Sequence, residues 1–240
     1  MYLFFCYYKY GMTRNDLTNW TDEQVKELAD KGEFIGAFEY GIRMYNQDRY
    51  QESWDYLYPL VNHNNFFIWN HIIDMADHYL KGIISDKELF ELLVKRHNYG
   101  SSSYSYKLAH MYRDGRGCRR SLTKYIELLK ICSNDGSTYA TYELAECYEK
   151  GFGVRKSMKK AFEVYYYWLD DHGRPDPWCE YKVAYYMLHE LGGQKKDMKA
   201  IEYYLKRAAW VHSEAERLYI ELFNEQPPTI RNPHPKKEGA

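Results

Sequence analysis

The feature that most constrains the fold of this chain is a unit of thirty residues, 144–173, with a glycine pair near its middle. Its sequence is LAECYEKGFGVRKSMKKAFEVYYYWLDDHG. Apolar residues recur at helical spacing on both sides of Gly151-Phe152-Gly153, which predicts two helices joined by a sharp turn. A hairpin of this size cannot bury its own apolar face and needs neighbours like itself. The unit therefore predicts a stack of similar hairpins.

Similar units recur along the chain. Each expected first helix carries a small residue at its middle, where a large side chain would hold the partner helix away. These residues follow one another at spacings of 35, 33, 36 and 39: Gly41, Ala76, Ala109, Ala145 and Ala184. Loop glycines recur six or eight residues after them, at Gly82, Gly115, Gly117, Gly151, Gly153 and Gly192. The pattern predicts an all-α fold, a right-handed α-solenoid of about five stacked antiparallel helix hairpins with terminal capping helices.

The expected organisation is one repeat domain over residues 21–223. Thr21 and Gln24 have the spacing of a capping box, which predicts a helix start, and Asp176-Pro177 predict another. Residues 1–20 are expected to form a partly ordered arm and the proline-rich residues 224–240 a flexible tail. The hairpins are expected at about 33–63, 68–98, 103–136, 137–173 and 177–212, with a capping helix at 213–223.

Composition narrows the class of function. Lys and Arg number 33 and Asp and Glu 34, and the formal net charge of -1 argues against broad attraction to nucleic acid or anionic lipid. Five cysteines without a C-x-x-C pair are expected to be free thiols in a reducing compartment. Neither a signal peptide nor an apolar run of membrane-spanning length is recognised, so a cytoplasmic protein is expected, with either Met1 or Met12 as its start.

Two segments carry a family motif. LAHMYRDGRGC (residues 108–118) and LAECYEKGFGVRKSMKKA (residues 144–161) resemble the Sel-one-like (Sel1-like) repeat family, a tetratricopeptide-like branch of the α-solenoids. Its signature is L-x-x-x-Y-x-x-G-x-G-V followed by K-A in the second helix. The resemblance covers about residues 33–223 and weakens toward the N-terminus. It implies protein–protein interaction, because Sel1-like repeat proteins serve as adaptors and scaffolds in signalling, in degradation complexes and in bacterial contacts.

The expected binding site is the concave groove that the first helices of such a solenoid line. Tyr106, Tyr142 and Tyr181 are predicted to form an aromatic ladder there, with His110 and Glu146 beside it as polar selectors. The alternative is that these tyrosines pack between adjacent first helices. The full set of expected partner-binding residues is Phe38, Ile42, Ile73, Asp77, Tyr106, His110, Tyr142, Glu146, Tyr181 and Tyr185.

The sequence thus favours a non-catalytic interaction module or adaptor that binds a partner protein or peptide. One alternative is a small cytoplasmic inhibitor or immunity-type protein that masks a toxin or an enzyme, and a second is a hydrolase with a cysteine or histidine site. His189-Glu190 begins like a zincin motif, but Gly193 stands in the place of the second histidine. We therefore expect no enzyme and no cofactor. Exposed tyrosines would also permit self-association.

Two clusters of charged and histidine residues are further candidate sites. His71, Asp74 and His78 could share one helix face, but no fourth ligand accompanies them, so no metal site is expected. The other cluster is cationic and is interpreted as a solvated outer face: Arg155, Lys156, Lys159 and Lys160.

Overall fold

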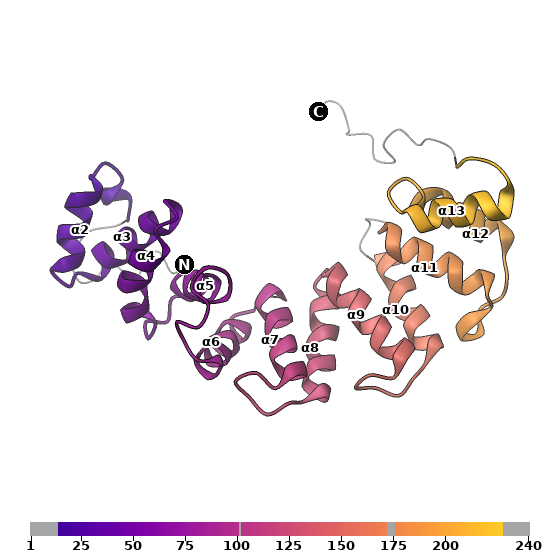
Figure 1. Cartoon of the computed structure of the whole chain (residues 1–240), viewed down its shortest axis with the longest axis horizontal. Coiled ribbons are helices and arrows are strands. Elements are labelled where there is room, and N and C mark those ends of the chain that lie inside the picture. The colour runs from indigo at the N-terminus through magenta and orange to yellow at the C-terminus, as the bar shows by residue number, and fades with distance from the viewer. Residues whose placement is uncertain (1–13, 101, 172–175, 228–240) are drawn as a thin grey trace. The chain divides into compact units, whose positions relative to one another are not determined.

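The computed structural model describes residues 14–100, 102–171 and 176–227, and these residues form helices and connecting turns, with no β-strand among them (Figure 1). Two compact units make up the chain. The N-terminal unit comprises Met1–Arg119 and the C-terminal unit Arg120–Ala240. Within each unit, consecutive helices pack on one another as hairpins, which is the arrangement of an α-solenoid. The predicted fold class is therefore confirmed.

The N-terminal unit is a series of paired helices. Helix α2 packs on α3, α3 on α4, α5 on α6, and α6 on α7. Its first core cluster includes the fully buried Leu17, Val25 and Met44. The elements are the 3₁₀ turn η1 (Arg14–Leu17), α2 (Asp22–Asp30), α3 (Phe34–Asn46), α4 (Tyr50–Leu57), the 3₁₀ turn η2 (Tyr58–Leu60), α5 (Phe66–Asp74), the π-helix η3 (Met75–Tyr79), α6 (Asp86–Asn98) and α7 (Ser102–Asp114).

The C-terminal unit continues the same pattern. Each of its α-helices packs on the next, and the last helix, α13, covers the apolar face of α12 through Ala215 and Tyr219. This contact closes the unit as the expected capping helix does. The elements are α8 (Leu122–Asn134), α9 (Thr138–Lys150), α10 (Met158–Asp171), α11 (Pro177–Leu188), the 3₁₀ turn η4 (Leu191–Gly193), α12 (Met198–Ala208) and α13 (Ser213–Phe223).

Both helix starts predicted from capping residues are confirmed. Thr21 and Gln24 form the two reciprocal hydrogen bonds of a capping box at the start of α2. Asp176 accepts the backbone N–H of Cys179 at 3.1 Å and Pro177 is the first residue of α11. Residues 1–13 of the expected arm and residues 228–240 of the expected tail lie outside the described residues.

The small residues at the helix centres lie where two helices approach closely. Ala109, Ala145 and Ala184 are fully buried. At Gly41 even a methyl group is too large, because a Cβ atom there would lie 2.5 Å from Cγ of Leu57 in α4. Gly41 therefore lies at a close contact between α3 and α4, and the three alanines occupy core positions where a larger side chain would not fit without a shift of its neighbours.

The second glycine of the later loops makes a contact that the sequence analysis did not anticipate. A Cβ atom on any of these glycines would press on the first residue of the second helix in the preceding hairpin. Such a Cβ atom would lie 2.0 Å from the carbonyl oxygen of Asp86 if placed on Gly117, and 2.8 Å from the carbonyl oxygen of Met158 if placed on Gly192. On Gly153 it would lie 3.1 Å from Cβ of Leu122. Each of these loops therefore rests on the helix start of the preceding hairpin, and at Gly117 and Gly192 the neighbouring backbone leaves room for no side chain.

Replacing Gly117 with alanine should destabilise the N-terminal unit strongly. The matched control is Gly82→Ala in the preceding loop, because Gly82 has a similar positive φ of 83° but no atom within 4 Å of its Cβ position. Both variants place alanine in a left-handed backbone conformation, which is strained, but only Gly117→Ala also brings a methyl group against the backbone of Asp86. We expect Gly117→Ala to lose ~2 kcal/mol more unfolding free energy than the control in urea titrations. Equal losses would show that the close approach is unimportant.

A buried carboxylate in the C-terminal unit makes stability depend on pH. Glu180 of α11 is only 2% exposed, and its Oε1 atom lies 2.5 Å from Nε of Arg207 in α12. Burial raises the pKa of Glu180 from 4.5 to about 7, an effect that Arg207 opposes in part. The folded state holds the proton of Glu180 more tightly than the unfolded chain does. Protonation of Glu180 therefore stabilises the fold fully below pH 4.5, and this stabilisation is lost as the pH rises through about 7.

We therefore expect the unfolding free energy of the protein to fall between pH 5 and pH 8 by up to ~3 kcal/mol through this group. The Glu180→Gln variant cannot ionise at this position and should show a flatter profile over the same range. Urea denaturation at a series of pH values measures the difference. Parallel profiles for the two proteins would contradict the assignment of this pH dependence to Glu180.

Candidate functional site

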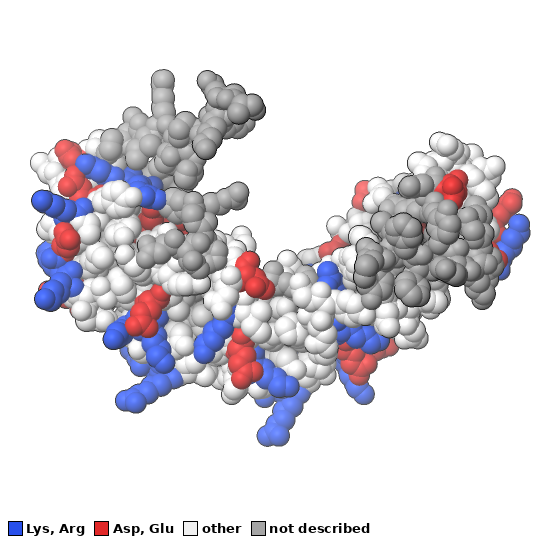
Figure 2. Space-filling model, turned by 180° about the vertical axis from the view of Figure 1, so that it is seen from behind, with Lys and Arg blue, Asp and Glu red and all other residues white. Residues whose placement is uncertain are grey.

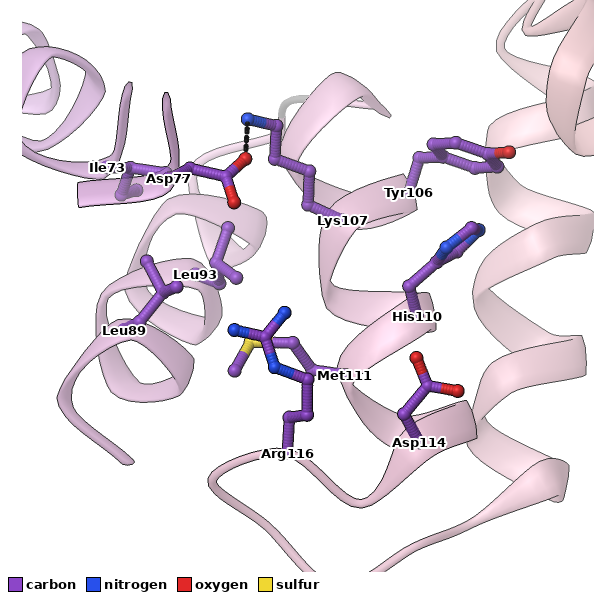
Figure 3. A pocket seen from close by; sticks show the side chains of 10 residues that line it. All are labelled: Ile73, Asp77, Leu89, Leu93, Tyr106, Lys107, His110, Met111, Asp114 and Arg116. Carbon is purple, nitrogen blue, oxygen red and sulfur yellow. Dashed lines mark hydrogen bonds and ion pairs between the residues drawn. The ribbon is translucent and has the colours of Figure 1, made fainter. Parts of the chain in front are cut away.

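A small pocket opens in the N-terminal unit where the end of α5, the π-helix η3, α6 and α7 meet (Figure 3). Its volume is about 200 Å³. The floor is apolar: Ile73, Leu93 and Met111 are at most 3% exposed, and Leu89 is 7% exposed. Leu89 and Leu93 are four residues apart and therefore share one face of α6. The floor thus belongs to the packed core and is fixed in shape.

The rim of the pocket carries charges of both signs that are held in place by ion pairs. Nζ of Lys107 lies 2.6 Å from Oδ2 of Asp77 across the opening. Arg116 extends from the loop after α7 and pairs with Asp86 at 2.8 Å. These contacts limit the rotamers of the two cations and leave their remaining N–H groups able to meet a ligand.

Asp114 and His110 complete the rim on the α7 side. Nε of Arg113 donates to Oδ1 of Asp114 at 2.8 Å, and this hydrogen bond is the main reason why the pKa of Asp114 lies below its usual value. The imidazole of His110 packs against the ring of Tyr106, with 4.6 Å between ring centroids. The rim therefore offers an aromatic wall beside a carboxylate that stays ionised.

The π-helix η3 forms one side of the pocket opening. Its wide turn ends with the backbone N–H of Leu80 donating to the carbonyl of Met75 at 2.7 Å. Such turns are rare and are often found at functional sites. This one positions Asp77 for its ion pair with Lys107 and leaves the ring of Tyr79 exposed, stacked on Tyr50 with 3.8 Å between centroids.

The structure brings four of the expected binding residues together at this pocket: Ile73, Asp77, Tyr106 and His110. The sequence analysis missed the contribution of α6, of Met111 and of the loop residue Arg116. A signal for Leu89 and Leu93 existed in the apolar spacing of α6, but second helices were not considered as part of the site.

Phe38 and Ile42 lie elsewhere than expected. They are 9% and 6% exposed, and Phe38 stacks on Phe34 with 6.1 Å between ring centroids. Helix α3 packs against α2 on one side and α4 on the other, so positions that are open in a later first helix are covered here. These two side chains are part of the core rather than of an open groove.

Tyr142 serves the packing of the C-terminal unit. Its hydroxyl donates to Oδ1 of Asp176 at 2.5 Å, the carboxylate that also caps α11. Burial, followed by this hydrogen bond, raises the pKa of the Tyr142 phenol well above its usual value. Tyr142 therefore links the neighbouring first helices α9 and α11, which is the alternative role considered for the ladder tyrosines.

A half-buried aromatic row follows α11. Tyr181 stacks on His212 with 4.8 Å between centroids and also contacts Trp178, while Tyr185 packs on His189 at 4.3 Å. Glu146 is exposed on α9 and pairs with Lys150 at 2.5 Å. Tyr106 belongs to the other unit, so the ladder of Tyr106, Tyr142 and Tyr181 stays a prediction.

Three of the cysteines in the described ranges lie in surroundings that oppose nucleophilic activation. Cys132, Cys147 and Cys179 are buried free thiols. Burial raises the pKa of Cys132 to about 11 and also raises the pKa values of Cys147 and Cys179. The thiol form, which is the weaker nucleophile, therefore predominates at neutral pH in all three.

The candidate metal ligands are engaged in other contacts. The Tyr45 hydroxyl donates to Asp74, and Nδ1 of His71 donates to the carbonyl of Phe67 at 2.8 Å. Over the described residues, no three His, Cys, Asp or Glu side chains are grouped so that they could hold a metal ion. None of the helices in the described ranges is both long and apolar enough to cross a membrane.

Comparison with known proteins agrees with the repeat geometry. The Sel1 repeat model matches residues 102–129, 138–165 and 179–209, which correspond to α7–α8, α9–α10 and α11–α12. No curated protein matches the sequence.

Two solved structures share the fold. A Sel1 repeat protein from Oxalobacter formigenes is similar with a TM-score of 0.63 and 18% identity over 75% of this chain and 73% of that one. The protective antigen c5321 of uropathogenic Escherichia coli, described as displaying an SLR fold, has a TM-score of 0.57 and 15% identity over 88% of this chain. The match spans about half of c5321, 54% of its length. The chain therefore contains three Sel1 repeats and shares the α-solenoid fold of these two proteins.

Proposed function

We propose that this protein is a non-catalytic adaptor whose N-terminal pocket receives one apolar side chain from an extended or helical segment of a partner protein. The observation that carries the proposal is a cavity of about 200 Å³ whose floor is apolar and whose rim carries charges held by ion pairs. Helical-repeat folds of this class mediate protein interactions. Recognition by an apolar anchor with polar contacts around it is the usual form of such binding.

The size of the pocket supports a side chain rather than a cofactor as its occupant. Pockets for drug-sized ligands measure roughly 300–1,000 Å³, and this one has about 200 Å³. Burying a Leu, Met or Phe side chain contributes roughly 1.5–3 kcal/mol, which alone does not hold a complex together. The residues around the anchor must therefore contribute, and the rim offers Lys107 and Arg116 to acidic neighbours and Asp114 to basic ones.

We expect a random peptide library displayed on phage to yield binders that share one large apolar residue with charged residues beside it. Replacing Tyr106 and His110 with alanine removes the aromatic wall and should weaken a selected peptide by roughly 10-fold or more in fluorescence anisotropy. The matched control is Tyr139→Ala, because Tyr139 is a helix-surface tyrosine that is 70% exposed. Replacing the apolar residue of the peptide with alanine should have the same effect as the pocket variant.

The proposal fails if selected peptides bind the Tyr106→Ala/His110→Ala protein as tightly as the wild type while circular dichroism shows an unchanged fold. It also fails if the Tyr139→Ala control loses as much affinity as the pocket variant.

A further inference from the structure

Three loops between first and second helices carry the same charged feature. Two adjacent cations stand directly before the residue that caps the second helix: Arg119-Arg120 before Ser121, Arg155-Lys156 before Ser157, and Lys195-Lys196 before Asp197. All six side chains are exposed. The equivalent loop between α5 and α6 has Ile83-Ile84 at this place. The dibasic pair is therefore a property of the later repeats.

The loop glycines bring these cations close to further lysines in the C-terminal unit. Gly192 rests on Met158 and Lys159, so the loop of Lys195-Lys196 lies against the start of α10. Gly153 rests on Leu122, so the loop before α10 lies against the start of α8. Figure 1 shows the α9–α10 and α11–α12 loops at the same end of their hairpins. We call the resulting surface the basic loop edge: Arg120, Lys124, Arg155, Lys156, Lys159, Lys160, Lys195, Lys196 and Lys199.

Charge on the basic loop edge is strongly unbalanced. Residues 120–124, 151–160 and 190–199 contain these nine cations and two acids, Glu190 and Asp197, in a chain whose net charge is -1. Asp197 is occupied in capping α12, where it accepts the backbone N–H groups of Lys199 and Ala200. Figure 2 shows Lys and Arg side chains projecting from the surface. Six of the nine cations form no ion pair with a carboxylate of the described residues: Arg155, Lys156, Lys159, Lys195, Lys196 and Lys199.

These cations lie where they oppose folding. A helix start carries partial positive charge and is stabilised by acidic residues. Helices α2 and α6 follow this rule, with Asp22 and Asp86 in their first turns. Helices α8, α10 and α12 have no acidic residue in the first turn, and they carry lysine there instead. The second helices of three hairpins therefore carry lysine where positive charge is unfavourable for the helix, which favours a role for these lysines in binding an anionic partner.

We propose that the basic loop edge docks an acidic segment of a partner protein. Sites for single-stranded nucleic acid present exposed aromatic rings on which the bases stack. Phe152, the ring in the α9–α10 loop, is half-buried and packs toward Tyr125 with 6.1 Å between centroids. The nine cations of this edge, with only two acids among them, are instead complementary in charge to a chain of carboxylates. The proposal goes beyond the pocket, because it concerns another surface and another kind of ligand.

The first test uses a fluorescein-labelled peptide of alternating Glu and Gly residues and fluorescence anisotropy at low salt. Charge reversal at four edge positions (Arg155→Glu, Lys156→Glu, Lys195→Glu, Lys196→Glu) should weaken binding by roughly 20-fold or more. The matched control reverses four exposed cations outside the edge (Lys31→Glu, Lys95→Glu, Lys130→Glu, Arg217→Glu), and its affinity should stay within roughly 3-fold of wild type. Tyr106→Ala should leave this binding unchanged.

A second variant separates binding from folding. Ser85 and Glu88, three residues apart, form a capping box at the start of α6. Ser121 and Ser157 cap α8 and α10, and a glutamate three residues after each, at positions 124 and 160, would complete the same motif. We expect Lys124→Glu/Lys160→Glu to raise the Tm while it weakens peptide binding.

The proposal is overturned if the edge variant binds the acidic peptide as well as wild type, or if the control loses as much affinity. Tighter binding to a single-stranded oligothymidine of equal charge, or to vesicles containing phosphatidylserine, would also overturn the assignment of an acidic protein segment.

Discussion

The repeat architecture depends on the contact between the second loop glycine of a hairpin and the helix start of the hairpin before it. At Gly117 and Gly192 the neighbouring atoms are backbone carbonyl groups, which cannot rotate away as a side chain can. Backbone against backbone sets a fixed distance between successive hairpins. Inside the hairpin α3–α4, Gly41 lets the two helices approach closely at Leu57.

The sequence contains 27 tyrosines, and several of those in helix contacts serve the same purpose. Their rings fill helix contacts while their hydroxyls donate to carboxylates on a neighbouring helix. Tyr40 reaches Glu52 at 2.6 Å, Tyr125 reaches Glu143 at 2.8 Å and Tyr186 reaches Glu149 at 2.8 Å. A phenylalanine would fill the same space without the hydrogen bond. Tyrosine thus lets a thin stack of helices keep carboxylates near its core without leaving them unpaired.

The sequence predicted the hairpins and the caps because these depend on neighbouring residues: a small residue at a helix centre, a glycine in a loop, Asp176 before Pro177. It predicted the site less well. The rule that selected Tyr106 and His110, which line the pocket, also selected the buried Phe38, because it treated every first helix as having the same surroundings and took no account of the packing of α2 on α3. The pocket floor joins α5, α6 and α7, and the π-turn at Met75–Tyr79 has no signature in its sequence.

The glycine contact also bears on how such a chain can grow or shrink. The hairpins α7–α8 and α9–α10 each present the start of the second helix to the next repeat and place a loop glycine on the previous one, so each carries two complementary halves of a joint. Whole hairpins can then be duplicated or lost in evolution without a new interface being invented. Insertions that part a glycine from its loop, by contrast, break the joint and the register of every hairpin after it.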